Sequence, residues 1–175
     1  AISIIEKGSV IASGGSATLG EVGLLDYIKE HSKDYTFIDR TVAKEEEEKR
    51  QIHAKAILSD YYLMSTNAFT MDGQLVNIDG NGNRVSALCY GPKHVVIITG
   101  MNKLVPSVED AYKRIRQDAC PPNCVRLGLT TPCSQTGVCG ECISTSSICG
   151  LFVTTRISRY PDRIHVIMVG EELGY

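Results

Sequence analysis

The sequence predicts an α/β fold built on one open, mostly parallel sheet, and three patterns support this prediction. Short β-rich runs alternate with amphipathic segments through residue 118, as in strands joined by helices. Residues 94–99 read HVVIIT, a continuous apolar run typical of a parallel strand buried on both faces. Thr18 and Glu21 have the capping-box spacing of a helix N-terminus.

The first part of the chain is expected to supply three strands and two helices. The strands are three short apolar runs, at residues 9–13, 35–38 and 61–65. One helix should begin at Thr18 and run to about His31, because apolar residues recur there at helical spacing. The second covers residues 43–59, where glutamates precede basic residues by four positions.

The rest of the chain is expected to add a hairpin, a buried strand, a helix and a final hairpin. Asn81-Gly82 predicts a tight turn between paired strands at residues 75–79 and 84–88. A helix over residues 108–118 should follow the strand at 94–99, capped by Ser107. A cysteine-rich loop at residues 119–150 shows no helical or strand period, and two antiparallel strands, at 152–157 and 163–169, close the chain.

Length and charge limit the function. The 175 residues predict one domain spanning 1–175, with the loop at 119–150 inserted before the last two strands. The net charge of −2 argues against nucleic-acid binding, since no basic excess would displace counterions. No apolar run is long enough to span a bilayer, and no signal-peptide pattern opens the chain.

The cysteines are concentrated in one segment. Six of the seven lie between residues 120 and 149, where an even spread would place about one. Thiolates are soft ligands that suit zinc or iron–sulfur clusters. The candidate ligands are four thiols, with two alternates: Cys133, Cys139, Cys142 and Cys149, then Cys120 and Cys124.

Residue spacing alone does not choose between the uses of these thiols. A [4Fe–4S] cluster is the leading expectation, and a structural zinc ion is the alternative. Free thiols and disulfides remain open, although the absence of a visible secretory signal makes disulfides less expected.

Polar residues follow the predicted strands where an α/β sheet binds ligands. Gly14, Gly15, Ser16 and Thr18 lie between a strand and a helix, which is a natural anion site. Further polar residues follow other strands, at Asn67, Asp72, Asp79, Asn83 and Lys103. Asp72 is the candidate general base, with Asn67 orienting a substrate hydroxyl and Lys103 facing a carboxylate or phosphate.

Several stretches together resemble the lactate-utilisation (LUD) domain family. They are GGSATL at 14–19, STNAFTMDG at 65–73, VNIDGNGNR at 76–84, GPK at 91–93, GMNK at 100–103, RIR at 114–116, the TPC-to-Cys149 segment from 131, and RIHVIMVGEELG at 163–174. The resemblance implies a Rossmann-like sheet, similar to sugar-phosphate isomerases and CoA transferases. It also implies a bacterial cytoplasmic protein linked to oxidation of lactate to pyruvate, with iron–sulfur partner subunits.

Three functions are expected as alternatives. The first is a lactate-utilisation-type protein that binds a small 2-hydroxy or 2-oxo acid and carries a [4Fe–4S] cluster. The second is an enzyme like the sugar-phosphate isomerases or CoA transferases, with a phosphorylated substrate and a structural zinc loop. The third is a non-catalytic electron-transfer or adaptor subunit. No nicotinamide-binding glycine fingerprint opens the first helix.

Overall fold

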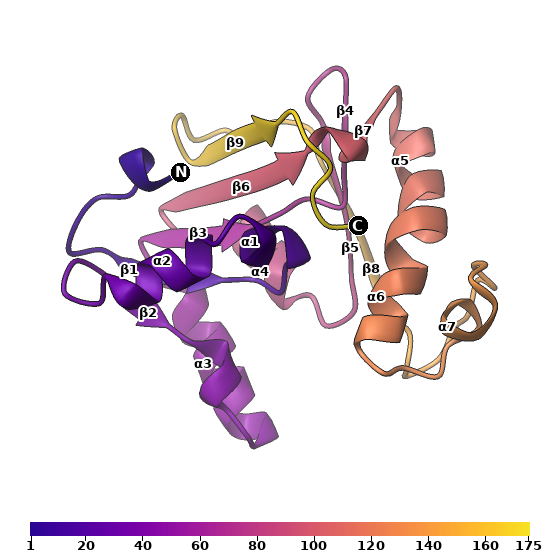
Figure 1. Cartoon of the computed structure of the whole chain (residues 1–175), viewed down its shortest axis with the longest axis horizontal. Coiled ribbons are helices and arrows are strands. Elements are labelled where there is room, and N and C mark those ends of the chain that lie inside the picture. The colour runs from indigo at the N-terminus through magenta and orange to yellow at the C-terminus, as the bar shows by residue number, and fades with distance from the viewer.

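The computed structural model describes residues 1–175, which form two sheets with helices around them (Figure 1). The first sheet is entirely parallel, in the order β2 (Thr36–Ile38), β1 (Val10–Ser13), β3 (Tyr61–Met64), β6 (His94–Gly100) and β9 (Ile164–Val169). The predicted α/β class is therefore confirmed. The chain leaves β1 toward β2 and returns to β3 on the other side, so the loops after β1 and β3 diverge and open a crevice.

The second sheet is mixed and follows the order β7 (Leu104–Val105), β4 (Ala68–Thr70), β5 (Leu75–Asp79) and β8 (Leu151–Thr155). β5 pairs antiparallel with β4 and β8, whereas β4 runs parallel to β7. The predicted C-terminal hairpin is wrong, because β8 and β9 lie in different sheets. Because they are separate, β8 pairs with β5 and β9 pairs with β6. The peptide groups along these edges of the buried strands β5 and β6 therefore have hydrogen-bond partners.

The three regions predicted to be helical contain helices in the structure, and further helices lie outside them. The helices are η1 (Ile2–Ile4), α1 (Ala17–Glu21), α2 (Leu24–Glu30), η2 (Arg40–Val42), α3 (Glu46–Ile57), α4 (Asn83–Cys89), η3 (Met101–Lys103), α5 (Val108–Arg114), a π-helical turn (Ile115–Ala119), α6 (Cys120–Arg126) and α7 (Pro132–Thr136). The helix predicted from Thr18 to His31 is broken at Gly23, which has φ +65°. Ser16 caps α1 in place of Thr18.

The strand predicted at residues 84–88 is helix α4 instead. The Asp79 carboxylate accepts hydrogen bonds from the backbone N–H groups of Asn81, Gly82 and Val85. These bonds satisfy free donors at the start of a helix, which a hairpin turn would not offer. The cysteine-rich segment is also more ordered than predicted, because α5 continues through the π-helical turn into α6. Pro121 and Pro122 fit the first turn of α6, where no N–H is required.

Three apolar clusters hold the layers together. One lies between the first sheet and helices α1 and α2, around Ile11, Leu19 and Ile28. A second joins β3 and β6 to α4 and reaches Phe69 and Leu75 of the second sheet. The third packs β5 against α5 and the start of α6. Figure 1 shows α5 and α6 alongside β5 and β8 of the second sheet. No helix is both long and apolar enough to cross a lipid bilayer.

Candidate functional site

A cavity of about 460 Å³ lies beyond the carboxyl ends of β1, β3 and β5. Its walls come from the loops after these strands, from Lys103, from α6 and from the strap at residues 145–148. Four cationic side chains line it: Arg40, Arg84, Arg126 and Lys103. Asp79 is the one carboxylate side chain among the lining residues. This excess of positive charge makes the cavity suited to an anion.

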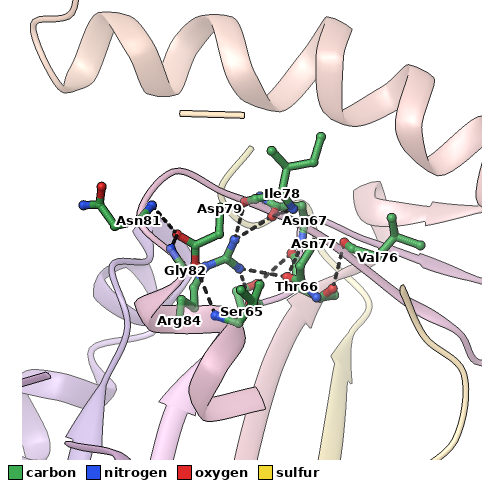
Figure 2. A network of polar contacts seen from close by, with 11 residues as sticks. Ser65, Thr66, Asn67, Val76, Asn77, Ile78, Asp79, Asn81, Gly82 and Arg84 are labelled. Carbon is green, nitrogen blue, oxygen red and sulfur yellow. Dashed lines mark hydrogen bonds and ion pairs between the residues drawn. The ribbon is translucent and has the colours of Figure 1, made fainter. Parts of the chain in front are cut away.

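Arg84 is the centre of the polar network at the base of the cavity (Figure 2). One terminal nitrogen donates to the Asn77 side-chain oxygen at 2.8 Å and to the Ser65 carbonyl at 3.2 Å. The other donates to the Asn67 side-chain oxygen at 2.7 Å and to the Ile78 carbonyl at 2.8 Å. Its Nε lies 3.7 Å from an Asp79 oxygen. These bonds join the segment between β3 and β4 to β5 through one guanidinium.

The Arg84 charge is buried but compensated. Desolvation lowers the pKa of the guanidinium, while the nearby Asp79 carboxylate raises it. Asp79 is held in place by its three backbone N–H bonds. Because Arg84 uses both terminal nitrogens on the chain itself, we assign it a positioning role.

Lys103 is the buried amine of the site, with only 4% of its surface exposed. Its Nζ donates to the Thr18 hydroxyl at 3.0 Å and to the Ser65 hydroxyl at 3.2 Å. Burial, followed by repulsion from Arg114, lowers the pKa of Lys103 to about 8. No carboxylate hydrogen-bonds to it, and the attraction of Glu21 for the ammonium form only partly offsets the cost of burial. A bound carboxylate or phosphate would supply a hydrogen-bonded anionic partner.

The other cations lie at the edge of the cavity. The Arg40 guanidinium makes no hydrogen bond within the chain and lies over Gly15, where an added Cβ would come within 2.8 Å of it. Gly15 therefore leaves room for the arginine. Arg126 is held by Asn123 at 2.6 Å. The side-chain oxygen of Asn67 accepts from Arg84 and from the Ile78 N–H, which leaves its NH₂ group as a donor at the cavity wall.

The structure brings most of the predicted ligand-binding residues together. The cavity is lined by Gly15, Ser16, Thr18, Asn67, Asp79, Asn83 and Lys103. Gly14 lies behind the wall, where an added Cβ would meet the Arg84 side chain at 3.1 Å. Asp72 does not line the cavity. It is exposed on the turn between β4 and β5, hydrogen-bonded to Thr70 and Gln74, so we assign it no role toward a ligand in the cavity.

Sequence reasoning missed the arginines. The sequence places Arg84 in a strand after a tight turn, and only its position in the first turn of α4 directs it toward Asp79 and Asn67. Arg40 and Arg126 have no distinguishing pattern. The sequence does contain one signal for Arg84. Asp79 precedes the glycine-rich turn, and an Asp at such a position can cap a helix, which would place Arg84 in the first helical turn.

The thiols of the cysteine-rich segment form two close pairs. Cys120 Sγ lies 3.5 Å from Cys149 Sγ, and Cys124 Sγ lies 3.7 Å from Cys133 Sγ. Hydrogen bonding from Cys120 lowers the pKa of Cys149 to about 7, although burial opposes this shift. Burial raises the pKa of Cys124 to about 11. Cys120 also lines the cavity.

The predicted set of four ligands is not gathered at one point. Cys133 and Cys149 each contact a different thiol of α6, while Cys139 and Cys142 hydrogen-bond to no other thiol. No three His, Cys, Asp or Glu side chains are placed to hold a single metal ion. As arranged, these residues do not fit a cluster ligated by Cys133, Cys139, Cys142 and Cys149, and no chemical step is assigned to one. That ligand set stays a prediction.

Comparisons with known proteins give the family. The chain is similar to a solved DUF162 family protein from Deinococcus radiodurans, with a TM-score of 0.40 and 12% identity over 93% of this chain and 88% of that one. It is also similar to ribose 5-phosphate isomerase from Plasmodium falciparum (0.37, 14%, over 60% and 48%) and to ribose 5-phosphate isomerase A from Methanocaldococcus jannaschii (0.38, 16%, over 73% and 63%). This chain thus spans less than two thirds of either isomerase chain.

No curated protein matches the chain. The model of the LUD domain, however, matches residues 1–169, which is nearly the whole sequence. The chain belongs to the LUD domain family.

Proposed function

We propose that this LUD-domain protein binds a small 2-hydroxy or 2-oxo acid in the cavity and takes part in oxidising lactate to pyruvate. The supporting observation is the buried Lys103 ammonium, which has two hydroxyl partners and no carboxylate. A substrate carboxylate placed against the buried Lys103 amine would gain a charge-assisted hydrogen bond. Arg40 offers a second cation at the mouth.

The residues around the proposed substrate have different roles. The Asn67 NH₂ group is free to donate to a hydroxyl or keto oxygen, because Arg84 fixes the other end of the amide. Lys103 has a pKa of about 8 without ligand, and a bound carboxylate favours its charged form, so the lysine keeps its proton while the acid is bound. Arg84 and Asp79 position these groups and make no contact with the reacting atoms.

Oxidation of a 2-hydroxy acid releases two electrons and two protons. No part of this transfer is assigned to the predicted [4Fe–4S] cluster, because Cys133, Cys139, Cys142 and Cys149 are not gathered at one point. We propose partner iron–sulfur subunits as the final electron acceptor, because this chain offers no nicotinamide-binding fingerprint. Cys120 places the thiol-rich segment at the wall of the cavity.

Ligand-dependent thermal shift tests the binding site. Lactate and pyruvate should raise the melting temperature of the wild-type protein, and Lys103→Met should abolish that shift. Lys55→Met removes the same charge from the exposed surface of α3 and should leave the shift intact. Acetamide, a small neutral molecule, should not raise the melting temperature of the wild-type protein if the carboxylate charge of lactate and pyruvate is needed for binding. An equal shift in Lys103→Met would contradict the proposed site.

The cavity volume favours a second candidate, a phosphorylated sugar. The cavity volume of about 460 Å³ is in the range of pockets that bind molecules the size of a drug or a sugar phosphate. It is larger than a three-carbon acid fills. The same cations would then hold the phosphate. If ribose 5-phosphate shifts the melting temperature and lactate and pyruvate do not, the phosphosugar function replaces the first.

A further inference from the structure

Two thiols from different elements meet at the wall of the cavity. Cys120 is the first residue of α6 and is buried, and Cys149 lies two residues before β8. Their sulfur atoms are 3.5 Å apart, although the two residues are 29 positions apart in the sequence. A disulfide bond is about 2.05 Å long, so the two sulfur atoms need to approach by about 1.5 Å to form one. Because they are already in contact, no other atom blocks that approach.

The backbone on both sides of Cys149 fixes the position of its thiol. The Cys149 N–H donates to the Ser147 hydroxyl at 3.1 Å. Gly150 lies so close to the loop after β5 that an added Cβ would come within 2.8 Å of the Gly80 carbonyl oxygen. Cys149 also packs against the third apolar cluster, which contains Cys120. The packing of the fold therefore holds the two thiols in contact.

The second thiol pair provides an internal comparison. The sulfur atoms of Cys124 and Cys133 lie 3.7 Å apart, but only 1% of Cys124 and 7% of Cys133 is exposed. Cys149 is partly exposed, and it is the only one of the four paired thiols that is not buried. A small oxidant in solution therefore reaches Cys149 first. The two pairs have similar sulfur–sulfur distances and differ in their access to solvent.

We propose that Cys120 and Cys149 are a redox-active pair, which a small disulfide molecule oxidises to an internal disulfide, and that this bond fastens the strap at residues 145–148 to α6. Cys120 and the strap both line the cavity, so the bond fixes part of the cavity wall. The proposal does not depend on which ligand the cavity binds.

Each of the two steps exchanges one sulfur–sulfur bond for another. The Cys149 thiolate attacks one sulfur of the small disulfide, which forms a mixed disulfide and releases one molecule of the small thiol. The Cys120 thiolate then attacks the Cys149 sulfur, which forms the internal bond and releases the second molecule. In total the two cysteines lose two electrons and two protons, and the small disulfide takes up both as it is reduced to two thiols.

The first test counts thiols in a full-length variant that keeps only the two pairs. This variant is Cys89→Ser/Cys139→Ser/Cys142→Ser, which leaves four thiols. Oxidised glutathione is added to the folded, reduced protein, and the thiols that remain are labelled with a maleimide after denaturation. The count should fall from four to two, and dithiothreitol should restore it to four.

Peptide mapping by mass spectrometry then locates the bond. It should join Cys120 to Cys149 and leave Cys124 and Cys133 reduced. Four free thiols after oxidation, a bond between Cys124 and Cys133, a stable mixed disulfide on Cys149 or a metal ion bound by Cys120 and Cys149 would each overturn the proposal.

Single substitutions in the same background test the order of the two steps. Cys120→Ser should stop after the first step and keep one glutathione on Cys149, because the second attacking thiol is missing. Cys149→Ser should take up no glutathione and form no disulfide. Cys124→Ser is the matched control from the same helix and should form the internal bond as before. Equal glutathione uptake by Cys120→Ser and Cys149→Ser, or loss of the bond in Cys124→Ser, would contradict the assignment. If Cys120→Ser does not fold, the mapping of the unsubstituted pairs still decides.

The effect on the strap needs a readout of its own. Hydrogen–deuterium exchange at residues 144–149 should slow several-fold on oxidation, because the bond ties the end of the strap to α6. Exchange in α3, which is far from both thiols in the fold (Figure 1), should stay the same and serves as the control. Equal exchange of the strap in the two redox states would overturn its fastening to α6.

Discussion

The depressed pKa of Lys103 makes a quantitative prediction about stability. Its pKa falls from 10.5 to about 8 in the folded protein. Each unit corresponds to about 1.4 kcal/mol, so burying the charged amine costs about 3 kcal/mol at pH 7. The sign comes from proton counting: between these two pKa values the unfolded chain binds more protons than the folded one. Raising the pH through this range therefore relieves the cost and stabilises the fold.

The substitution Lys103→Met removes the titrating group while keeping a similar length. Relative to this variant, wild-type protein should gain about 1 kcal/mol in free energy of unfolding from pH 7 to pH 9, and about 2.5 kcal/mol by pH 10. Urea unfolding of both proteins under reducing conditions measures this difference, and other titrating groups cancel because both proteins contain them.

A control separates this effect from a general change in charge. Lys55 is exposed on α3, and Lys55→Met should track the wild type at every pH. Parallel pH curves for wild type and Lys103→Met would refute the reasoning, because they would mean that Lys103 keeps its ordinary pKa in the fold.

Three further predictions concern the surrounding structure. Arg84→Met should lower the free energy of unfolding by about 3–5 kcal/mol, because it leaves Asp79 buried without its cation; urea unfolding should show a much smaller loss for the exposed Arg50→Met. Gly100→Ala should destabilise the protein by about 1–3 kcal/mol, since its Cβ would lie 2.5 Å from the Leu173 nitrogen. Gly20→Ala on α1 meets nothing within 4 Å and should instead raise the melting temperature; equal effects of both would contradict the packing. Asp72→Asn should leave ligand-induced thermal shifts unchanged, and their loss would return Asp72 to the site.

The parallel sheet was predictable because its signal is local. A continuous apolar run such as residues 94–99 is stable in a strand that is covered on both faces. This is the environment of β6 in the structure. The final two strands were also located correctly along the chain. Their pairing was not, because a hairpin and two separate edge pairings have the same sequence pattern. The choice depends on the free edges of β5 and β6, which are set by distant residues.

The candidate site was predictable where it lies at strand ends. Lys103, Asn67 and the Gly15–Thr18 loop were found because ligands gather beyond the carboxyl ends of parallel strands. Arg84 was missed because Asn81-Gly82 suits a hairpin as well as a helix start, and the Asp79 cap that decides between them is a tertiary outcome. The partners of the thiols were equally hidden, since Cys120 and Cys149 are brought together only by the fold.

The Arg84 network has a consequence for motion. Arg84 and Arg114 both bind Asn67, at the point where the chain passes from the first sheet into the second. The two sheets should therefore rotate as one rigid body and not hinge at this junction. The strap at residues 145–148, by contrast, is held by local hydrogen bonds such as Ser147 N to the Ser144 carbonyl. Ile148, at the end of the strap, packs against the third apolar cluster, so we expect the wall of the cavity at residues 145–147 to adjust to a ligand more readily than the wall built on Arg84.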